Sequence, residues 1–141
     1  MAESKDYQTF KRNALEPLDR VDRIENFLVI GMPDVNCCVD GAEAWVEFKS
    51  SVEPKRPTTA LFGSNHKLSQ EQKNWMLRQR NAGGRCYILV ATDKRWMLID
   101  GKCADGLNEM TVTELAKTAV WVAALPIKEK QWKLLRSKLA N

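Results

Sequence analysis

The sequence has a single histidine, His66, and four cysteines, none of which form a Cys-x-x-Cys pair. Structural zinc sites are built from closely spaced cysteines and histidines, so this scarcity argues against one. It also argues against metal centres that need several histidines, such as that of a His-Asn-His nuclease. Cys37 and Cys86 stand in apolar strand patterns, and we interpret them as small core residues of a reduced compartment.

Long hydrophobic runs are also missing. No apolar stretch approaches the roughly 20 residues of a membrane span, and the polar start of the sequence does not resemble a signal peptide. We therefore expect a cytoplasmic protein with no membrane partner. A strong excess of one charge is absent as well, because the formal net charge of +4 permits a polyanionic partner without requiring one.

The remaining composition is that of an ordinary globular protein. With 141 residues, of which 44% are hydrophobic and 28% charged, the chain is long enough to bury a sizeable core. No internal repeat is visible. We expect a single domain over 1–141.

The most informative segment is Gly31-Met32-Pro33-Asp34, which is followed by Glu47 and Lys49. Apolar stretches on both sides of Asp40-Gly41 predict a strand, a two-residue turn and a second strand. In this hairpin Asp34 lies opposite Glu47, with Cβ atoms about 5 Å apart. Lys49 lies two residues further along the same face. Two acids and a lysine placed in this way can hold a divalent metal against a phosphodiester.

The opposite face of the hairpin supports this register. It carries only apolar residues, namely Val35, Cys37, Val39, Ala42, Ala44, Val46 and Phe48. A slip by one residue would scatter this pattern and bury charge. Two alternatives stay open: the charged face can be an ordinary solvated surface, and a bulge at Pro33, which cannot donate a ladder hydrogen bond, can distort the pairing.

The flanking segments predict helices and further strands. Apolar residues at helical spacing predict a first helix over about 4–15, and an alternating stretch followed by an apolar run predicts an irregular strand over 21–30. Two prolines and many polar residues over 50–65 predict a long mobile loop, which can be functional or a plain insertion. Ser69 and Gln72 form a capping box for the next helix, which ends at a Gly-Gly pair.

The C-terminal third continues this alternation of helices and strands. A nearly continuous apolar run over 85–91 predicts a buried central strand, and a neighbouring strand follows it. After a Gly-rich loop, Thr111 caps the first of the C-terminal helices (111–139), which we expect to extend toward Ala124, and Pro126 starts the last helix. This order implies an α/β fold with a mixed central sheet flanked by helices.

Three motifs together match a known pattern: Gly-x-Pro-Asp at 31–34, Trp-Val-Glu-Phe-Lys at 45–49 and Lys-Leu-Ser-x-x-Gln-x-x-Trp at 67–75. Over about 20–100 the sequence resembles the PD-(D/E)xK nuclease superfamily. Within it, the sequence looks most like the VRR-NUC domains and the related phage and archaeal Holliday-junction resolvase-like enzymes. The resemblance implies a restriction-endonuclease-like fold.

The resemblance also implies a role for each matching residue of the hairpin. Asp34 and Glu47 would be metal ligands, the backbone carbonyl of Phe48 would be a third, and Lys49 would orient or activate the attacking water. The residue types suit Mg²⁺ (or Mn²⁺), which prefers oxygen ligands and usually takes one or two protein carboxylates. Such an ion neutralises charge on the phosphate, and the lysine adds a further positive charge.

Two more site residues follow from the same resemblance. Gln72 matches the glutamine that these enzymes place beside the site. They also supply a metal-binding, catalytic acid from before the Pro-Asp motif. Glu25 is our candidate for that acid, and Glu16 is the alternative.

Basic residues around this centre could contact DNA phosphates, with binding that weakens as salt increases. The candidates are Lys55, Arg56, Lys67, Arg78 and Arg80. Taken singly, each of them is more simply interpreted as a solvated surface charge. His66 could reach the site or lie on the surface, and we expect Trp75 to belong to the core rather than to stack on bases.

The leading hypothesis is a magnesium-dependent DNA endonuclease that acts on branched DNA in phage recombination or DNA processing, in the host cell cytoplasm. A resolvase must cut two opposed strands, so that version requires a homodimer. One alternative is a nicking or exonucleolytic processing enzyme with the same site. Another is a non-catalytic DNA-binding or partner-binding module of the same fold.

Overall fold

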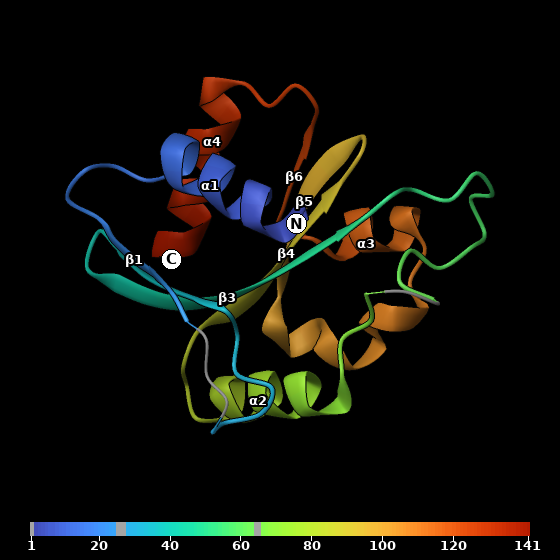
Figure 1. Ribbon diagram of the computed structural model, residues 1–141, viewed down its shortest axis with the longest axis horizontal. Helices are drawn as coiled ribbons and strands as arrows, with labels where there is room; N and C mark the ends of the chain where they lie inside the picture. Colours follow the sequence, from blue (N-terminus) through green and yellow to red (C-terminus); the bar gives the residue numbers. More distant parts are fainter. Residues whose placement is uncertain (1, 25–27, 64–65) are drawn as a thin grey trace.

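The computed structural model describes residues 2–24, 28–63 and 66–141 of the chain (Figure 1). Its centre is one six-stranded sheet whose strands lie in chain order. The strands are β1 (Arg20–Arg23), β2 (Val35–Val39), β3 (Ala42–Ser51), β4 (Cys86–Thr92), β5 (Arg95–Asp100) and β6 (Trp121–Ala124). No helix in these three described stretches is both long and apolar enough to cross a membrane.

The sheet is mixed. Strands β3 and β4 pair in parallel, whereas the other neighbouring strands pair antiparallel. A parallel pair needs a crossover connection, and the connection here contains α2 (Gln70–Asn81). The mixed sheet flanked by helices that the sequence predicts is therefore confirmed.

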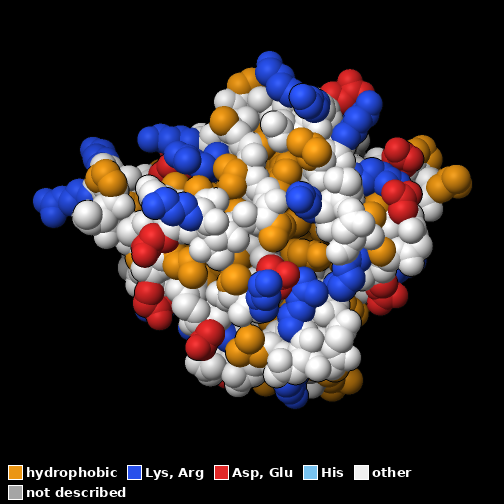
Figure 2. Space-filling view, turned by 180° about the vertical axis from the view of Figure 1, so that it is seen from behind, with side chains coloured by type: hydrophobic (Ala, Val, Ile, Leu, Met, Phe, Trp, Pro, Cys, Tyr) orange, Lys and Arg blue, Asp and Glu red, His pale blue; other side chains and the backbone are white. Residues whose placement is uncertain are grey.

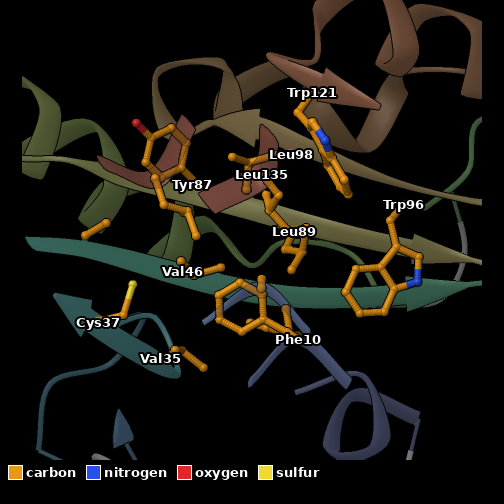
Figure 3. Close-up of a cluster of buried hydrophobic side chains, with 14 of the residues drawn as sticks. Phe10, Val35, Cys37, Val46, Tyr87, Leu89, Trp96, Leu98, Trp121 and Leu135 are labelled. Carbon is orange, nitrogen blue, oxygen red and sulfur yellow. The ribbon is translucent and has the colours of Figure 1, made fainter. Parts of the chain in front are cut away.

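Helices cover both faces of this sheet (Figure 1). Helices α1 (Ala2–Ala14) and α4 (Glu129–Ala140) pack on one face, over a first buried cluster. Figure 3 shows this cluster, in which Phe10 of α1 and Leu135 of α4 meet side chains from the sheet. Helix α2, the 3₁₀ helix η1 (Gly101–Glu109) and α3 (Val112–Thr118) cover the other face, over a second cluster. Both clusters share one sheet, so the fold is a single domain.

The β2–β3 hairpin has the register that the sequence predicts. In each pair, from Val35 with Val46 to Val39 with Ala42, the two residue numbers sum to 81, so Asp34 is aligned with Glu47. Asp40 and Gly41 form the turn with φ values of 51° and 80°, the left-handed region that a two-residue turn of this kind requires. The apolar side of the hairpin lies against the first cluster.

Three further predictions are confirmed. The first helix covers nearly the expected residues. Strand β4 is buried along its whole length, as its apolar sequence indicates. The capping box of α2 is formed in both directions, with the Ser69 hydroxyl accepting from the Gln72 N–H at 3.1 Å and the Gln72 Oε1 accepting from the Ser69 N–H at 2.9 Å.

The predicted helix from Thr111 toward Ala124 is wrong beyond Thr118. Helix α3 ends there, and β6 follows as an edge strand paired with β5. Trp121 and Ala123 are buried while Val122 is exposed, which is the two-residue period of a strand. The C-terminal part is therefore not purely helical. Its Gly-rich loop is the 3₁₀ helix η1, and α4 starts three residues after Pro126.

Within the predicted strand over 21–30 the structure describes 21–24 and 28–30, and the prediction is wrong for 24 and 28–30. Strand β1 covers only Arg20–Arg23, and Glu25 lies outside the described residues. Leu28 and Ile30 are 95% and 71% exposed in a bend and a turn that precede the Pro-Asp motif. An apolar run suggested burial here, but β1 pairs only with residues of β2, which starts at Val35.

The predicted mobile loop after β3 is tethered. Glu53 pairs with Arg95 at 2.9 Å, and its backbone N–H donates to Asp93 at 2.8 Å. Leu61 and Phe62 are buried in the second cluster. The composition of the segment showed its prolines but not these distant partners, which anchor both ends of its described part, whereas the mobility of the exposed residues 55–59 stays a prediction.

Candidate active site

The carboxylate of Asp34 lies beside β3, just before β2 begins. Its Oδ1 accepts a hydrogen bond from the backbone N–H of Phe48 at 3.1 Å. In the hairpin register Pro33 would be the partner of Phe48, and proline has no N–H to donate. The Asp34 side chain thus takes over pairing where the main chain of β2 cannot continue it, which fixes the carboxylate next to Glu47.

Gly31 explains why the motif begins with glycine. Its φ is +88°, and a Cβ atom there would lie 2.3 Å from the carbonyl oxygen of Glu71. Only glycine allows both this conformation and this close approach. The Gly31–Asp34 segment is thereby held against the first turn of α2.

Lys49 lies on the same face of β3 as Glu47. Its Nζ is 4.0 Å from Glu47 Oε2 and donates a hydrogen bond to the backbone carbonyl of Lys67 at 3.3 Å. The structure thus brings Asp34, Glu47 and Lys49 together, as the predicted register requires. The Lys67 carbonyl additionally limits where the ammonium group can move.

Burial gives this group unusual electrostatics. Glu47 is 6% exposed, and burial raises its pKa to about 8, with a further contribution from the negative charge of Asp34. Burial also raises the pKa of Asp34, against the Phe48 hydrogen bond and the charges of Arg23 and Lys49. The raised pKa values mean that the two carboxyl groups do not readily ionise next to each other. A cation between them would stabilise their ionised forms.

Glu3 is an acid beside the candidate site that sequence reasoning did not single out. Its Oε2 accepts a hydrogen bond from the Ser50 hydroxyl at 2.6 Å, and its charge is one of those that raise the pKa of Glu47. Glu3 stands four residues before Tyr7, whose ring packs edge-on against Phe48 at 6.1 Å. No local sequence signal identifies Glu3, because its approach to the hairpin follows from the packing of α1 on the sheet.

Neither candidate for the acid before the Pro-Asp motif is placed at the site by the described residues. Glu25 lies outside the described residues. Glu16, the alternative, is 3.6 Å from Arg136 of α4, so its carboxylate belongs to an ion pair with the C-terminal helix. Among the described acids before the Pro-Asp motif, Glu3 is the one whose negative charge helps to raise the pKa of Glu47.

Gln72 lies at the start of α2, where its backbone faces Gly31. Its side-chain oxygen is engaged by the Ser69 N–H of the capping box. This places the residue beside the Pro-Asp segment, and a catalytic role for it stays a prediction.

The predicted DNA-binding residues differ in whether their charged groups are engaged within the protein. The Arg80 guanidinium pairs with Asp100 at 2.7 Å and lies over the ring of Tyr87 at 5.2 Å, so it links α2 to neighbouring residues of β4 and β5. The others, Lys55, Arg56, Lys67 and Arg78, are exposed. Figure 2 shows one face of the molecule, where basic side chains are scattered among acidic and apolar ones.

Arg23 is a cation near the site that the sequence did not single out. Its guanidinium lies over the Tyr7 ring at 5.7 Å, and its charge lowers the pKa of Asp34. Trp75 packs edge-on against Trp45 with ring centroids 5.5 Å apart and is half-buried, as expected for a core-facing residue. His66 is exposed.

The donor set fits a hard divalent cation. The carboxylates available to such an ion are those of Asp34 and Glu47, with Glu3 nearby. In the described part of the chain no group of three or more His, Cys, Asp or Glu side chains is arranged to hold a metal ion. Mg²⁺ commonly uses only one or two protein carboxylates and keeps several waters. The Phe48 carbonyl faces the position of Pro33, which has no N–H to donate, and its role as a third ligand stays a prediction.

The comparisons with known proteins show similarity to solved structures. No protein-family model matches the chain, and no curated protein matches it. The solved structure of Hjc, a Holliday junction resolvase from the archaeal hyperthermophile Archaeoglobus fulgidus, is similar with a TM-score of 0.48 and 15% sequence identity. The similarity covers 72% of this chain and 76% of that chain.

Proposed function

We propose that this protein is a divalent-metal-dependent deoxyribonuclease with a restriction-endonuclease-like site. The observation that carries the proposal is the buried Glu47, which lies beside Asp34 and 4.0 Å from the Lys49 ammonium. A buried acid pair with one adjacent lysine is costly unless a charged ligand compensates it. The motif resemblance to PD-(D/E)xK nucleases points to the same chemistry.

In the proposed site, Asp34, Glu47 and the Phe48 carbonyl hold Mg²⁺ or Mn²⁺. The ion supplies charge neutralisation at the phosphate and activation of water. Glu3 is the proposed additional acid, held in place by Ser50. The Gly31–Asp34 segment positions Asp34 through its contact with α2.

The proposed reaction is in-line hydrolysis of a phosphodiester. A water molecule attacks phosphorus, the bond from phosphorus to the 3′ oxygen breaks, and the products are a 5′-phosphate and a 3′-hydroxyl. Lys49 stabilises the negative charge that grows on the phosphate oxygens. Its hydrogen bond to the Lys67 carbonyl keeps the ammonium oriented toward the site.

Branched DNA is the proposed substrate, because the motifs look most like those of VRR-NUC and resolvase-like enzymes. Cutting two opposed strands of a junction requires two sites, and we therefore propose a homodimer on DNA. Lys55, Arg56, Lys67 and Arg78 are the proposed phosphate contacts.

The experiment that tests this function is cleavage of a labelled four-way junction beside a matched linear duplex, with Mg²⁺ and with EDTA. Glu47→Gln removes a proposed ligand at nearly constant volume, and Glu43→Gln, an exposed position on the same strand, is the matched control. Paired symmetric cuts in the junction, lost with EDTA and in Glu47→Gln only, are expected. Equal cutting of both DNAs would indicate a general processing nuclease, and no cutting by folded protein would favour a binding module.

A further inference from the structure

The surface is hollowed beside the candidate active site into an open pocket of about 690 Å³. It lies where β3 and β4 end, with Ser50 and Ser51 on one side and Ala91 on the other. Asp6 of α1 and His66 complete its rim. The proposed hydrolysis leaves this space unused.

The walls of the pocket are held in place by the rest of the fold. The Thr92 hydroxyl donates to Glu53 Oε2 at 2.7 Å, and Glu53 also pairs with Arg95 at 2.9 Å. These bonds fasten the segment after β3 to the turn between β4 and β5. Leu61, which forms part of the floor, is 5% exposed. The pocket is therefore preformed rather than a gap between loose loops.

The pocket and the active site share a wall. Ser50 directly follows Lys49, and His66 directly precedes Lys67, whose carbonyl accepts the Lys49 hydrogen bond. The Ser50 hydroxyl in turn donates to Glu3. A nucleotide whose phosphate is held at Lys49 has its own base, or that of its neighbour, within reach of the pocket.

The chemistry of the lining selects the kind of group that fits. No lysine or arginine lines the pocket in the part of the chain that the structure describes, whereas the carboxylates Asp6 and Asp93 do. Such a lining repels phosphate. Carboxylates accept hydrogen bonds from the exocyclic amino groups of cytosine, adenine and guanine, and thymine has no such group. Val52 and Pro54 supply apolar surface for the flat face of a base.

We propose that this pocket receives one unpaired nucleobase with an exocyclic amino group, next to the phosphate held at Lys49. The inference rests on the proposed nuclease function and deepens it. Taking a base out of a duplex costs free energy, and the cost is smallest for a base that is already unpaired. The pocket would therefore favour DNA with a bulge, flap or branch over a continuous duplex.

The test measures binding without cleavage. Wild-type protein in EDTA is titrated into a duplex with one unpaired 2-aminopurine, a fluorescent base that carries an exocyclic amino group. Entry into the pocket removes the base from its neighbours, so its fluorescence should rise. The same base in a fully paired duplex is the control. An unchanged signal from the unpaired probe in a formed complex would overturn the inference.

Two variants locate the effect. Thr59→Trp fills the pocket from its exposed rim and should weaken binding of the unpaired probe about fivefold or more, with duplex binding unchanged. Thr58→Trp, at the neighbouring exposed position outside the lining, should change neither. Asp6→Asn keeps the volume and should reduce a wild-type preference for unpaired cytosine over thymine. Equal affinities of Thr59→Trp and Thr58→Trp for the unpaired probe would overturn the proposal. Equal affinities of the wild type for unpaired cytosine and thymine would also overturn it.

A parallel cleavage assay with Mg²⁺ separates this inference from the proposed function. DNA cleavage by a protein whose binding ignores the pocket variants would overturn the pocket inference alone. Pocket-dependent binding without cleavage by any divalent metal would support the pocket and overturn the proposed nuclease.

Discussion

Pro33 and Asp34 act as a unit at the end of β2. The proline stops the main-chain pairing with β3, and the aspartate side chain then accepts the Phe48 N–H at 3.1 Å. This hydrogen bond orients the Asp34 carboxylate. Because Pro33 has no N–H, the proline cannot donate a hydrogen bond to the Phe48 carbonyl. At the residue scale, the site is built by interrupting a strand.

Lys49→Ala is expected to lower the single-turnover cleavage rate about 100-fold or more at saturating Mg²⁺, because the proposed mechanism assigns its ammonium group to the growing phosphate charge. Single-turnover cleavage of labelled DNA measures this effect. Lys102→Ala, at an exposed position on η1, should leave the rate unchanged. Full cleavage by Lys49→Ala would show that the side chain has no such role.

The raised pKa of Glu47 predicts a pH-dependent stability without metal. Its pKa is about 8 in the folded protein against 4.5 unfolded, so the folded state binds the proton more tightly. The resulting stabilisation is complete below pH 4.5 and is lost as pH rises toward 8. Glu47→Gln should therefore exceed the wild type in stability by up to about 5 kcal/mol at pH 9 and come close to it near pH 5.

Urea denaturation at both pH values in EDTA measures this difference. Glu43→Gln, on the same strand but exposed, should show little change at either pH. A Glu47→Gln difference that is the same at both pH values would contradict the assigned cause.

Gly31→Ala should be more harmful than Gly41→Ala, although both glycines have positive φ values of 88° and 80°. A Cβ at Gly31 meets the Glu71 backbone at 2.3 Å, whereas one at Gly41 meets nothing within 4 Å. We expect a loss of about 1 kcal/mol at Gly41 from the conformation alone, and about 2 kcal/mol or more at Gly31. Similar losses in denaturant titrations of the two variants would exclude the proposed contact with α2.

At the element scale, some features of the fold depend on residues close together in the sequence, and others depend on contacts between distant residues. The hairpin register and the α2 capping box follow from residues a few positions apart, and both were predictable. Strand β6 was missed because its pairing with β5 competes with the helical pattern that begins at Thr111. Glu3 was missed because only the packing of α1 on the sheet brings it near Glu47. The roles of the site residues stay predictions.

Ser69→Ala should destabilise the protein by about 1 kcal/mol, because it removes the acceptor for the Gln72 N–H at the start of α2. Thr111→Ala removes the equivalent acceptor for the Glu114 N–H of α3, which is farther from the site. Denaturation should give similar losses for the two variants, whereas cleavage assays should show a loss only for Ser69→Ala. Equal activities would mean that the position of α2 does not affect the site.

At the scale of the whole molecule, one sheet divides two clusters, and the site lies at the margin between them. Phe48 packs into the first cluster beneath α1, while Glu47 and Lys49 face the side of α2. The acids therefore approach from both layers, because Glu3 comes with α1 and the Pro-Asp segment rests on α2. Metal binding should consequently couple to global stability.

Mg²⁺ at about 100 times its dissociation constant should raise the thermal midpoint of the wild type by about 5–10 °C. The ion compensates the buried carboxylates only in the folded protein, so the shift reports binding to the site. Asp34→Asn and Glu47→Gln should lose most of the shift, and Glu43→Gln should keep it. A shift of equal size in all four proteins would place the ion elsewhere.

The two-residue turn at Asp40-Gly41 constrains how this protein can vary through evolution. Exposed turns commonly tolerate an added or deleted residue. Here such a change would shift β2 by one position against β3 and move Asp34 out of line with Glu47. The turn is also joined to α4, because Arg136 donates to Asp40 at 3.0 Å. A surface turn far from the acids thus sets their alignment, and its length should vary less than its exposure suggests.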